Sequence, residues 1–188
     1  MSGQHPTAPD IFITQEGIKK LLNGLNPHKA AGPDNISPMI LKELADEIAP
    51  ILQLIFKRSY DTGVVSPLRK TANVCPVFKK GKTFEPINYR PISLTCICCK
   101  IMEHIITSHI LCHADNNNIL YDLQHRFRKK LSCETQLIEF IDDITNNLDN
   151  GQHTDCLIMD FSKAFDKVSH SLLTHKLQHY GITGKTNN

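Results

Sequence analysis

Carboxylates, aromatic residues and lysines lie close together in Asp155–His170, which reads DCLIMDFSKAFDKVSH. An uncharged apolar run, Cys156–Met159, comes directly before Asp160, and such a run predicts a buried strand that presents the carboxylate at the edge of a sheet. A carboxylate in that position can hold Mg²⁺, which prefers oxygen ligands. The alternative is a strand, a loop and a helix in which Asp160 and Asp166 are only capping or solvated acids. The residue types leave both interpretations open.

Two basic patches are present although the net charge is only +2. The first lies within residues 69–90 and the second within residues 126–130, whereas residues 139–149 are mostly acidic. Clustered basic groups can contact phosphates, but charge runs are more often solvated faces. The patches therefore indicate either a phosphate-binding surface or a solvated one. Their members are Arg69, Lys70, Lys79, Lys80, Lys82, Arg90, Arg126, Arg128, Lys129 and Lys130.

The composition is that of an ordinary globular protein. The 188 residues are 40% hydrophobic and 21% charged, which suits one domain, or one domain and a fragment. The sequence begins without a secretory signal, and no apolar run approaches the roughly 20 residues that cross a bilayer. We therefore expect a soluble intracellular protein that does not enter membranes. Seven irregularly spaced cysteines predict buried thiols in a reducing compartment rather than disulfides.

One pattern of cysteines and histidines imitates a zinc site. Cys96 and Cys99 form a Cys-x-x-Cys pair, which is followed by His109 and His113. A zinc finger has about twelve residues between its pairs, whereas this interval is shorter and rich in isoleucine. The pattern favours a packed helix with incidental thiols and imidazoles, and zinc binding is the weaker alternative.

Capping residues and hydrophobic periodicity predict the elements that position these groups. A strand over Asn73–Phe78 is expected to pair, through a basic turn, with a strand over Tyr89–Leu94. Pro50 is expected to end one helix or to start the next. Helices are predicted to begin near Thr14, Ser37, Ile101, Ser132 and Leu172 and to end near Leu25, Gly63, the Asp115–Asn118 loop, Gly151 and Gly181. The residues expected to face a core include Leu137, Ile141, Leu148, Leu172 and Leu173.

Two segments resemble the reverse transcriptases of non-LTR retrotransposons, and they occur in the order found in that family. The first is NYRPISL at 88–94, and the second is DFSKAFDKVSH at 160–170. Three further segments agree with this resemblance, namely KAAGPDNISPMILK, VCPVFKKG and QHRFRKKLSCETQL. The resemblance covers about Ile18 to Gly184. It implies an α+β fold that comprises the fingers subdomain of a right-hand polymerase and an incomplete palm.

The resemblance also implies a division of the chain and a reaction. Residues 1–13 would be a flexible lead-in, residues 14–150 the N-terminal extension and fingers, and residues 151–188 the start of a truncated palm. The family's reaction is RNA-templated DNA synthesis, with an RNA template, a DNA primer and dNTPs as partners. In such enzymes two Mg²⁺ ions activate the 3′ hydroxyl and stabilise the in-line displacement.

The DFSKAFD segment implies three site residues. Asp160 takes the place of the first catalytic, metal-binding carboxylate. The backbone carbonyl of Phe161 would be a further contact in the nucleotide site. Phe165 takes the place of the aromatic gate whose bulk rejects a ribose 2′ hydroxyl, whereas the resemblance gives no mechanistic role to Asp166.

The two fingers segments imply three basic site residues. Arg90 matches the arginine that grips the triphosphate, for which a planar group with several donors is suited. Lys79 matches the lysine of the first fingers segment. Lys80 is its neighbour and a possible substitute.

Two departures from the family pattern affect these expectations. Arg126 stands where the family usually has glycine. If this position needs positive φ or close approach to the template, the arginine would strain or block it. The sequence stops at Asn188, before the Tyr-x-Asp-Asp hairpin that supplies the other metal carboxylates, and we expect this polypeptide alone not to catalyse the reaction. The alternatives are a non-catalytic nucleic-acid-binding remnant and a relic with no function.

Overall fold

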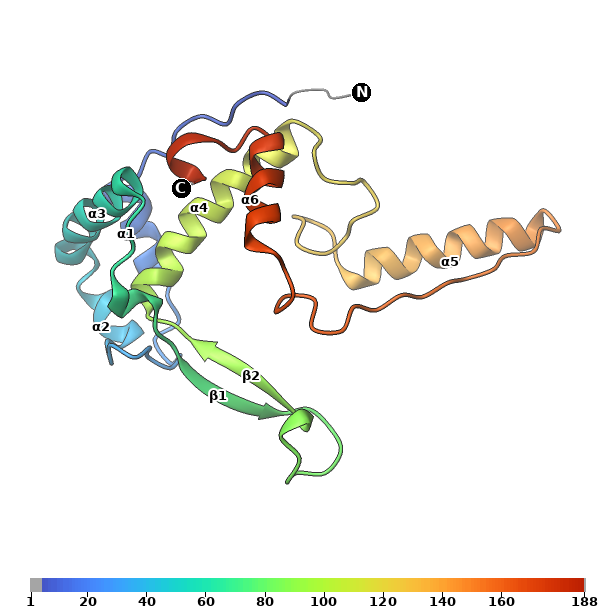
Figure 1. Ribbon diagram of the computed structural model, residues 1–188, viewed down its shortest axis with the longest axis horizontal. Helices are drawn as coiled ribbons and strands as arrows, with labels where there is room; N and C mark the ends of the chain where they lie inside the picture. Colours follow the sequence, from blue (N-terminus) through green and yellow to red (C-terminus); the bar gives the residue numbers. More distant parts are fainter. Residues whose placement is uncertain (1–4, 188) are drawn as a thin grey trace.

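The computed structural model describes residues 5–187 and shows a helical body from which two arms extend (Figure 1). The helical body contains α1, α2, α3, α4 and α6. The hairpin arm consists of β1, β2 and the loop between them, and the Asp160 arm consists of α5 and residues 150–168. The elements are α1 (Gln15–Asn23), α2 (Pro38–Glu43), α3 (Ala45–Thr62), η1 (Pro67–Lys70), β1 (Asn73–Phe78), η2 (Pro86–Asn88), β2 (Tyr89–Leu94), α4 (Ile97–Asn116), α5 (Cys133–Asp149), α6 (His170–His179) and η3 (Gly184–Thr186).

Hydroxyl side chains start four of the helices. Thr14, Ser37 and Ser132 accept backbone N–H groups of α1, α2 and α5, as predicted, and Ser169 does so for α6. In α5 the cap is reciprocal, because the Thr135 side chain also accepts the Ser132 N–H. The sequence signals for these helix starts are therefore confirmed.

Glycines follow α3, α5 and α6 at the predicted places. Gly63 follows α3 with a φ of 66°, and Gly151 and Gly181 follow α5 and α6 with φ values of 68° and 84°. A residue with a Cβ rarely adopts such angles, so glycine allows the chain to leave the helix there.

The predicted break at Pro50 is wrong. The chain breaks at Leu44, and Pro50 lies inside α3. A proline inside a helix costs about 3 kcal/mol. Ala49 precedes Pro50, Leu52 and Phe56 follow it, and all three are buried. Continuous burial of one α3 face therefore keeps the helix intact.

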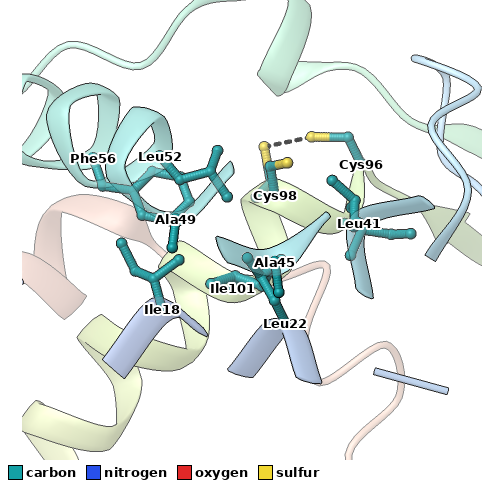
Figure 2. Close-up of a cluster of buried hydrophobic side chains, with 12 residues drawn as sticks. Ile18, Leu22, Leu41, Ala45, Ala49, Leu52, Phe56, Cys96, Cys98 and Ile101 are labelled. Atoms are coloured by element: carbon teal, nitrogen blue, oxygen red, sulfur yellow. Dashed lines mark hydrogen bonds between the residues drawn. The ribbon is translucent and has the colours of Figure 1, made fainter. Parts of the chain in front are cut away.

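The core lies where α1, α2 and α3 meet the start of α4 (Figure 2). Ile18, Leu22 and Phe56 have no exposed surface. The loop before α2 closes this core at Gly32, where an added Cβ would lie only 2.5 Å from the Cα of Cys96. Only glycine therefore permits this approach without a backbone shift.

The chain segments before α1 and after α6 contact each other on the helical body. The Ala8 N–H donates to the Gly181 carbonyl at 2.9 Å. His113 Nε2 donates to the Tyr180 carbonyl at 2.8 Å, and His109 Nε2 donates to the Pro9 carbonyl at 2.6 Å. Part of the predicted lead-in, within residues 5–13, is thus hydrogen-bonded to the helical body. Residues 1–4 lie outside the described part of the chain.

The two strands form the expected antiparallel hairpin. It is the only sheet in the described part of the chain, so neither of its faces is covered by another strand. Val74, Val77 and Ile92 are accordingly exposed.

The predicted strand over Cys156–Met159 is wrong. These residues have no strand pairing, and Leu157 and Ile158 are 83% and 86% exposed. A strand needs a neighbour that satisfies its N–H and C=O groups, and residues 5–187 supply none here.

The apolar faces of α5 and part of α6 are also not buried as expected. Helix α5 forms, but none of its side chains is buried. Leu137, Ile141 and Leu148 are exposed, as are Leu172 and Leu173 of α6. The periodicity gave the correct helices, but no second layer packs on these faces within residues 5–187. No described helix is long and apolar enough to cross a membrane.

Candidate nucleotide and nucleic-acid interface

The hairpin arm places two of the predicted basic site residues on one face. Arg90 of β2 lies opposite Val77 of β1. The pairing continues one step past β1, because the Lys79 N–H donates to the Asn88 carbonyl at 2.8 Å. Side chains alternate along a strand, so Lys79, two residues beyond Val77, shares the Arg90 face. Lys80 follows in a bend outside the strand.

This basic face is not neutralised by neighbouring acids. Lys79, Lys80 and Arg90 are exposed, and none of them forms an ion pair with another described residue. The acid in the adjoining loop, Glu85, instead accepts a hydrogen bond from Asn88 Nδ2 at 3.0 Å. The basic groups are therefore free to meet a phosphate.

Asn88 and Tyr89 organise the loop that joins the strands, a role that the sequence reasoning missed. Asn88 Nδ2 also donates to the Lys82 carbonyl at 2.9 Å, and the Tyr89 hydroxyl donates to the Thr83 carbonyl at 2.7 Å. Gly81 has a φ of 94°, and a Cβ there would lie 2.7 Å from Asn88 Nδ2. The glycine after the two lysines and the asparagine at the start of NYRPISL were the available signals.

Asp160 and the two phenylalanines lie in the Asp160 arm, separate from the hairpin arm (Figure 1). Asp160 is exposed, and Phe161 and Phe165 are 81% and 78% exposed. A turn follows Asp160, in which Lys163 has a φ of 54° and its carbonyl accepts the Lys167 N–H at 3.2 Å. No hydrogen bond or ion pair between described side chains joins this arm to Lys79 or Arg90.

The described residues do not fit a two-Mg²⁺ site. No group of three or more His, Cys, Asp or Glu side chains within residues 5–187 is arranged to hold a metal ion. Asp160 lies on a segment without secondary structure, so its carboxylate is not fixed beside a second one. A magnesium site at Asp160 would therefore need further carboxylates beside it.

The second basic patch is anchored by His125, another residue that the sequence reasoning missed. Its side chain is buried, with Nδ1 2.7 Å from Thr135 Oγ1 and Nε2 2.8 Å from Glu139 Oε2. Since a carboxylate only accepts, Nε2 is the donor in the second contact. These contacts hold residues 126–130 against the start of α5.

The departure at Arg126 does not have the expected backbone consequence. Positive φ occurs at Phe127 and Lys130, with values of 63° and 65°, and not at Arg126. The Arg126 guanidinium instead lies 5.4 Å from the centre of the Phe127 ring. The arginine is thus accommodated without a left-handed conformation.

Comparison with known proteins shows the class to which this arrangement belongs. Residues 77–187 match the model of the family described as reverse transcriptase (RNA-dependent DNA polymerase). The match contains both the hairpin lysines and the Asp160 arm. The chain belongs to the reverse transcriptase family, and the resemblance noted in its sequence is confirmed.

The individual relatives are polymerases of mobile elements. The chain is 30% identical over 169 residues to the RNA-directed DNA polymerase from mobile element jockey of Drosophila melanogaster, covering 89% of the chain and 18% of that protein. It is 28% identical over 177 residues to the probable RNA-directed DNA polymerase from transposon BS of the same fly, covering 90% and 20%. The chain thus spans about a fifth of the length of these relatives.

Proposed function

We propose that this chain is part of an RNA-directed DNA polymerase of a non-LTR retrotransposon, with residues 14–150 as N-terminal extension and fingers and residues 151–188 as the start of the palm. The family match and the relatives named above support this proposal. The observation that carries it is the hairpin register, which gives Lys79 and Arg90 a common face without neighbouring ion pairs. Two cations on one face suit a polyphosphate.

In this proposal the hairpin binds the triphosphate of an incoming dNTP. Arg90 contributes a planar group with several donors, and Lys79 contributes a point charge. Lys80 lies in the bend beyond the strand and is less suited to the same phosphate. Phe165 restricts the sugar, and Phe161 contributes its backbone carbonyl.

Asp160 is proposed as a metal ligand of the whole polymerase rather than of these residues alone. Mg²⁺, when bound, would stabilise charge on the reacting phosphate. The described carboxylates do not assemble such a site. In primer extension with Mg²⁺ we therefore expect no incorporation from this chain, and incorporation that vanishes in Asp160→Ala would show that the site is complete.

A second candidate function is nucleic-acid binding without catalysis. It is favoured by the exposure of Lys129 and Lys130 in the loop held by His125, in addition to the hairpin cations. Basic groups on two arms suit the backbone of a duplex, whereas a single nucleotide needs only the hairpin.

The test compares two double variants with equal loss of charge. Lys79→Ala/Arg90→Ala removes the hairpin cations, and Lys57→Ala/Arg58→Ala removes two exposed cations of α3. Fluorescence anisotropy measures binding of dATP with Mg²⁺ and of an RNA–DNA duplex at several salt concentrations. Each lost phosphate contact lowers the slope of log K against log salt by about 0.7 to 0.9.

The first candidate predicts that the hairpin variant loses dATP binding while the α3 variant keeps it. The second predicts that the natural chain binds the duplex but not dATP, with a reduced salt slope in the hairpin variant. Equal effects of the two double variants would contradict both candidates, because binding would then depend on net charge alone.

A further inference from the structure

Two buried thiols face each other where β2 passes into α4. Cys96 is the N-cap residue of α4, and Cys99 lies in its first turn. The Cys96 thiol donates to the Cys99 sulfur at 3.0 Å, the contact drawn as a dashed line in Figure 2. The Cys99 thiol in turn donates to the Arg69 carbonyl at 3.4 Å.

Both side chains are buried, and their backbone is held in place. Cys96 and Cys99 are only 6% and 7% exposed. The backbone of Cys96 is held by the close approach of Gly32, and Cys99 is held by the helix itself. The two sulfurs can separate only if a side chain changes its rotamer or if the loop that contains Gly32 opens.

We propose that Cys96 and Cys99 are an oxidisable dithiol, which a peroxide converts into a disulfide that joins the exit of β2 to the first turn of α4. An S–S bond is about 2.05 Å long, so the sulfurs must approach by about 1 Å. Rotation of the two side chains within one helical turn can provide such a displacement.

The oxidation proceeds in two balanced steps. One thiolate attacks a peroxide oxygen, the O–O bond breaks, and a sulfenic acid and the first water form after protonation. The second thiol attacks the sulfenic sulfur, the S–O bond breaks, and the oxygen leaves as the second water. In total the two thiols lose two electrons and two protons, and hydrogen peroxide is reduced to two waters.

The surroundings set the rate of this reaction. Burial raises the pKa of Cys99 to about 12, against which the nearby Arg69 guanidinium acts. The thiolate is the attacking species, so Cys99 should attack the peroxide slowly at neutral pH and faster as the pH rises. Cys75 and Cys112, by contrast, are exposed to solvent.

The third thiol of the cluster, Cys98, is not part of the pair. No hydrogen bond between described residues joins its sulfur to Cys96 or Cys99. Burial raises its pKa to about 11. Cys98 therefore remains reduced in the proposal and serves as an internal reference.

The experiment uses the chain in which the four exposed cysteines, Cys75, Cys112, Cys133 and Cys156, are replaced by serine. The reduced protein is treated with hydrogen peroxide, denatured and alkylated with N-ethylmaleimide. We expect a mass loss of about 2 Da from disulfide formation and a single adduct, which fragmentation places on Cys98. Dithiothreitol should restore three adducts.

Further variants assign the bond. Cys98→Ser in this background should still form the disulfide and leave no adduct. Cys96→Ser and Cys99→Ser should each leave two adducts and no disulfide. Three adducts after peroxide treatment, a disulfide that survives in Cys96→Ser or Cys99→Ser, or oxidation of these thiols to sulfinic acid would overturn the proposal. Peptide mapping of the natural chain after the same treatment decides the question if a variant fails to fold.

Discussion

In the helical body, α1, α3 and α4 bury Ile18, Phe56 and Ile101 against one another, whereas α5 in the Asp160 arm buries no side chain. Both regions contain amphipathic helices with correct caps. They differ in whether a second layer covers the apolar face. The residues that the family motifs associate with nucleotides all lie on the two arms, so the body supports the arms and the arms carry the candidate chemistry.

The largest effect is expected from truncating one aromatic ring in each region. Phe56→Ala should lower the free energy of unfolding by about 3 to 5 kcal/mol, because Phe56 is fully buried. Phe165→Ala, in the Asp160 arm, should change it by less than about 0.5 kcal/mol. Urea unfolding followed by far-UV circular dichroism measures both. Equal losses would mean that the Asp160 arm is packed in solution.

A second test concerns the contact between Gly32 and the start of α4. Gly32→Ala should cost about 1 to 3 kcal/mol, since the new methyl meets backbone atoms of Cys96. Gly24→Ala is the control, because its Cβ would make only ordinary contacts at 3.4 Å and beyond. The same urea titration would contradict this account if Gly32→Ala proved as mild as the control.

A third test removes one helix cap in each region. Ser37→Ala and Ser132→Ala each delete a cap worth about 1 kcal/mol. In the helical body the loss at Ser37 should lower the unfolding midpoint. In the Asp160 arm the loss at Ser132 should only speed amide hydrogen exchange in the first turn of α5, because few contacts link that helix to the body. A lower global midpoint in Ser132→Ala would show that the arm and the body unfold together.

The last test concerns an alkaline loss of stability in the body, which is absent at neutral pH. Burial raises the pKa of Cys98 and Cys99 from an ordinary value of 9.0 to about 11 and about 12. The folded state therefore holds these protons more tightly than the unfolded chain does. The stabilisation is present in full below about pH 9 and is lost as the pH rises through 11 and 12.

Thermal melts at pH 8 to 11 in the presence of a reductant measure this effect. The melting temperature of Cys99→Ala should fall less steeply with pH than that of the natural chain. Cys75→Ala is the control, since Cys75 is exposed on the hairpin arm. A slope that is unchanged in Cys99→Ala would rule out the thiol as the cause.

The features that were predicted correctly depend on residues that are close together in the sequence. Thr14 and Ser132 cap their helices because a hydroxyl three residues before an N–H needs no tertiary partner. The two strands of the hairpin were also predicted, although residues 79–88, which include η2, join them in place of the expected short basic turn. The family resemblance added proposed roles for Lys79 and Asp160, which local patterns alone left open.

The errors occurred where the outcome depends on distant contacts. The apolar run before Asp160 has strand composition, but it has no strand to pair with among the described residues. Pro50 was expected to break a helix that burial keeps intact. His125 was overlooked because its partners, Thr135 and Glu139, become neighbours only when the basic loop folds back onto α5.

The hydrogen bond from Ala8 to Gly181 brings together two points of the chain that are 173 residues apart in sequence. Segments attached before Ala8 and after Gly181 in a longer polypeptide would enter and leave the body side by side. A pulling force between them would act on this bond, on the His109 and His113 contacts and on the bonds that tie Lys185 and Thr186 to α3. The core around Phe56 would be shielded from such a force until these contacts open.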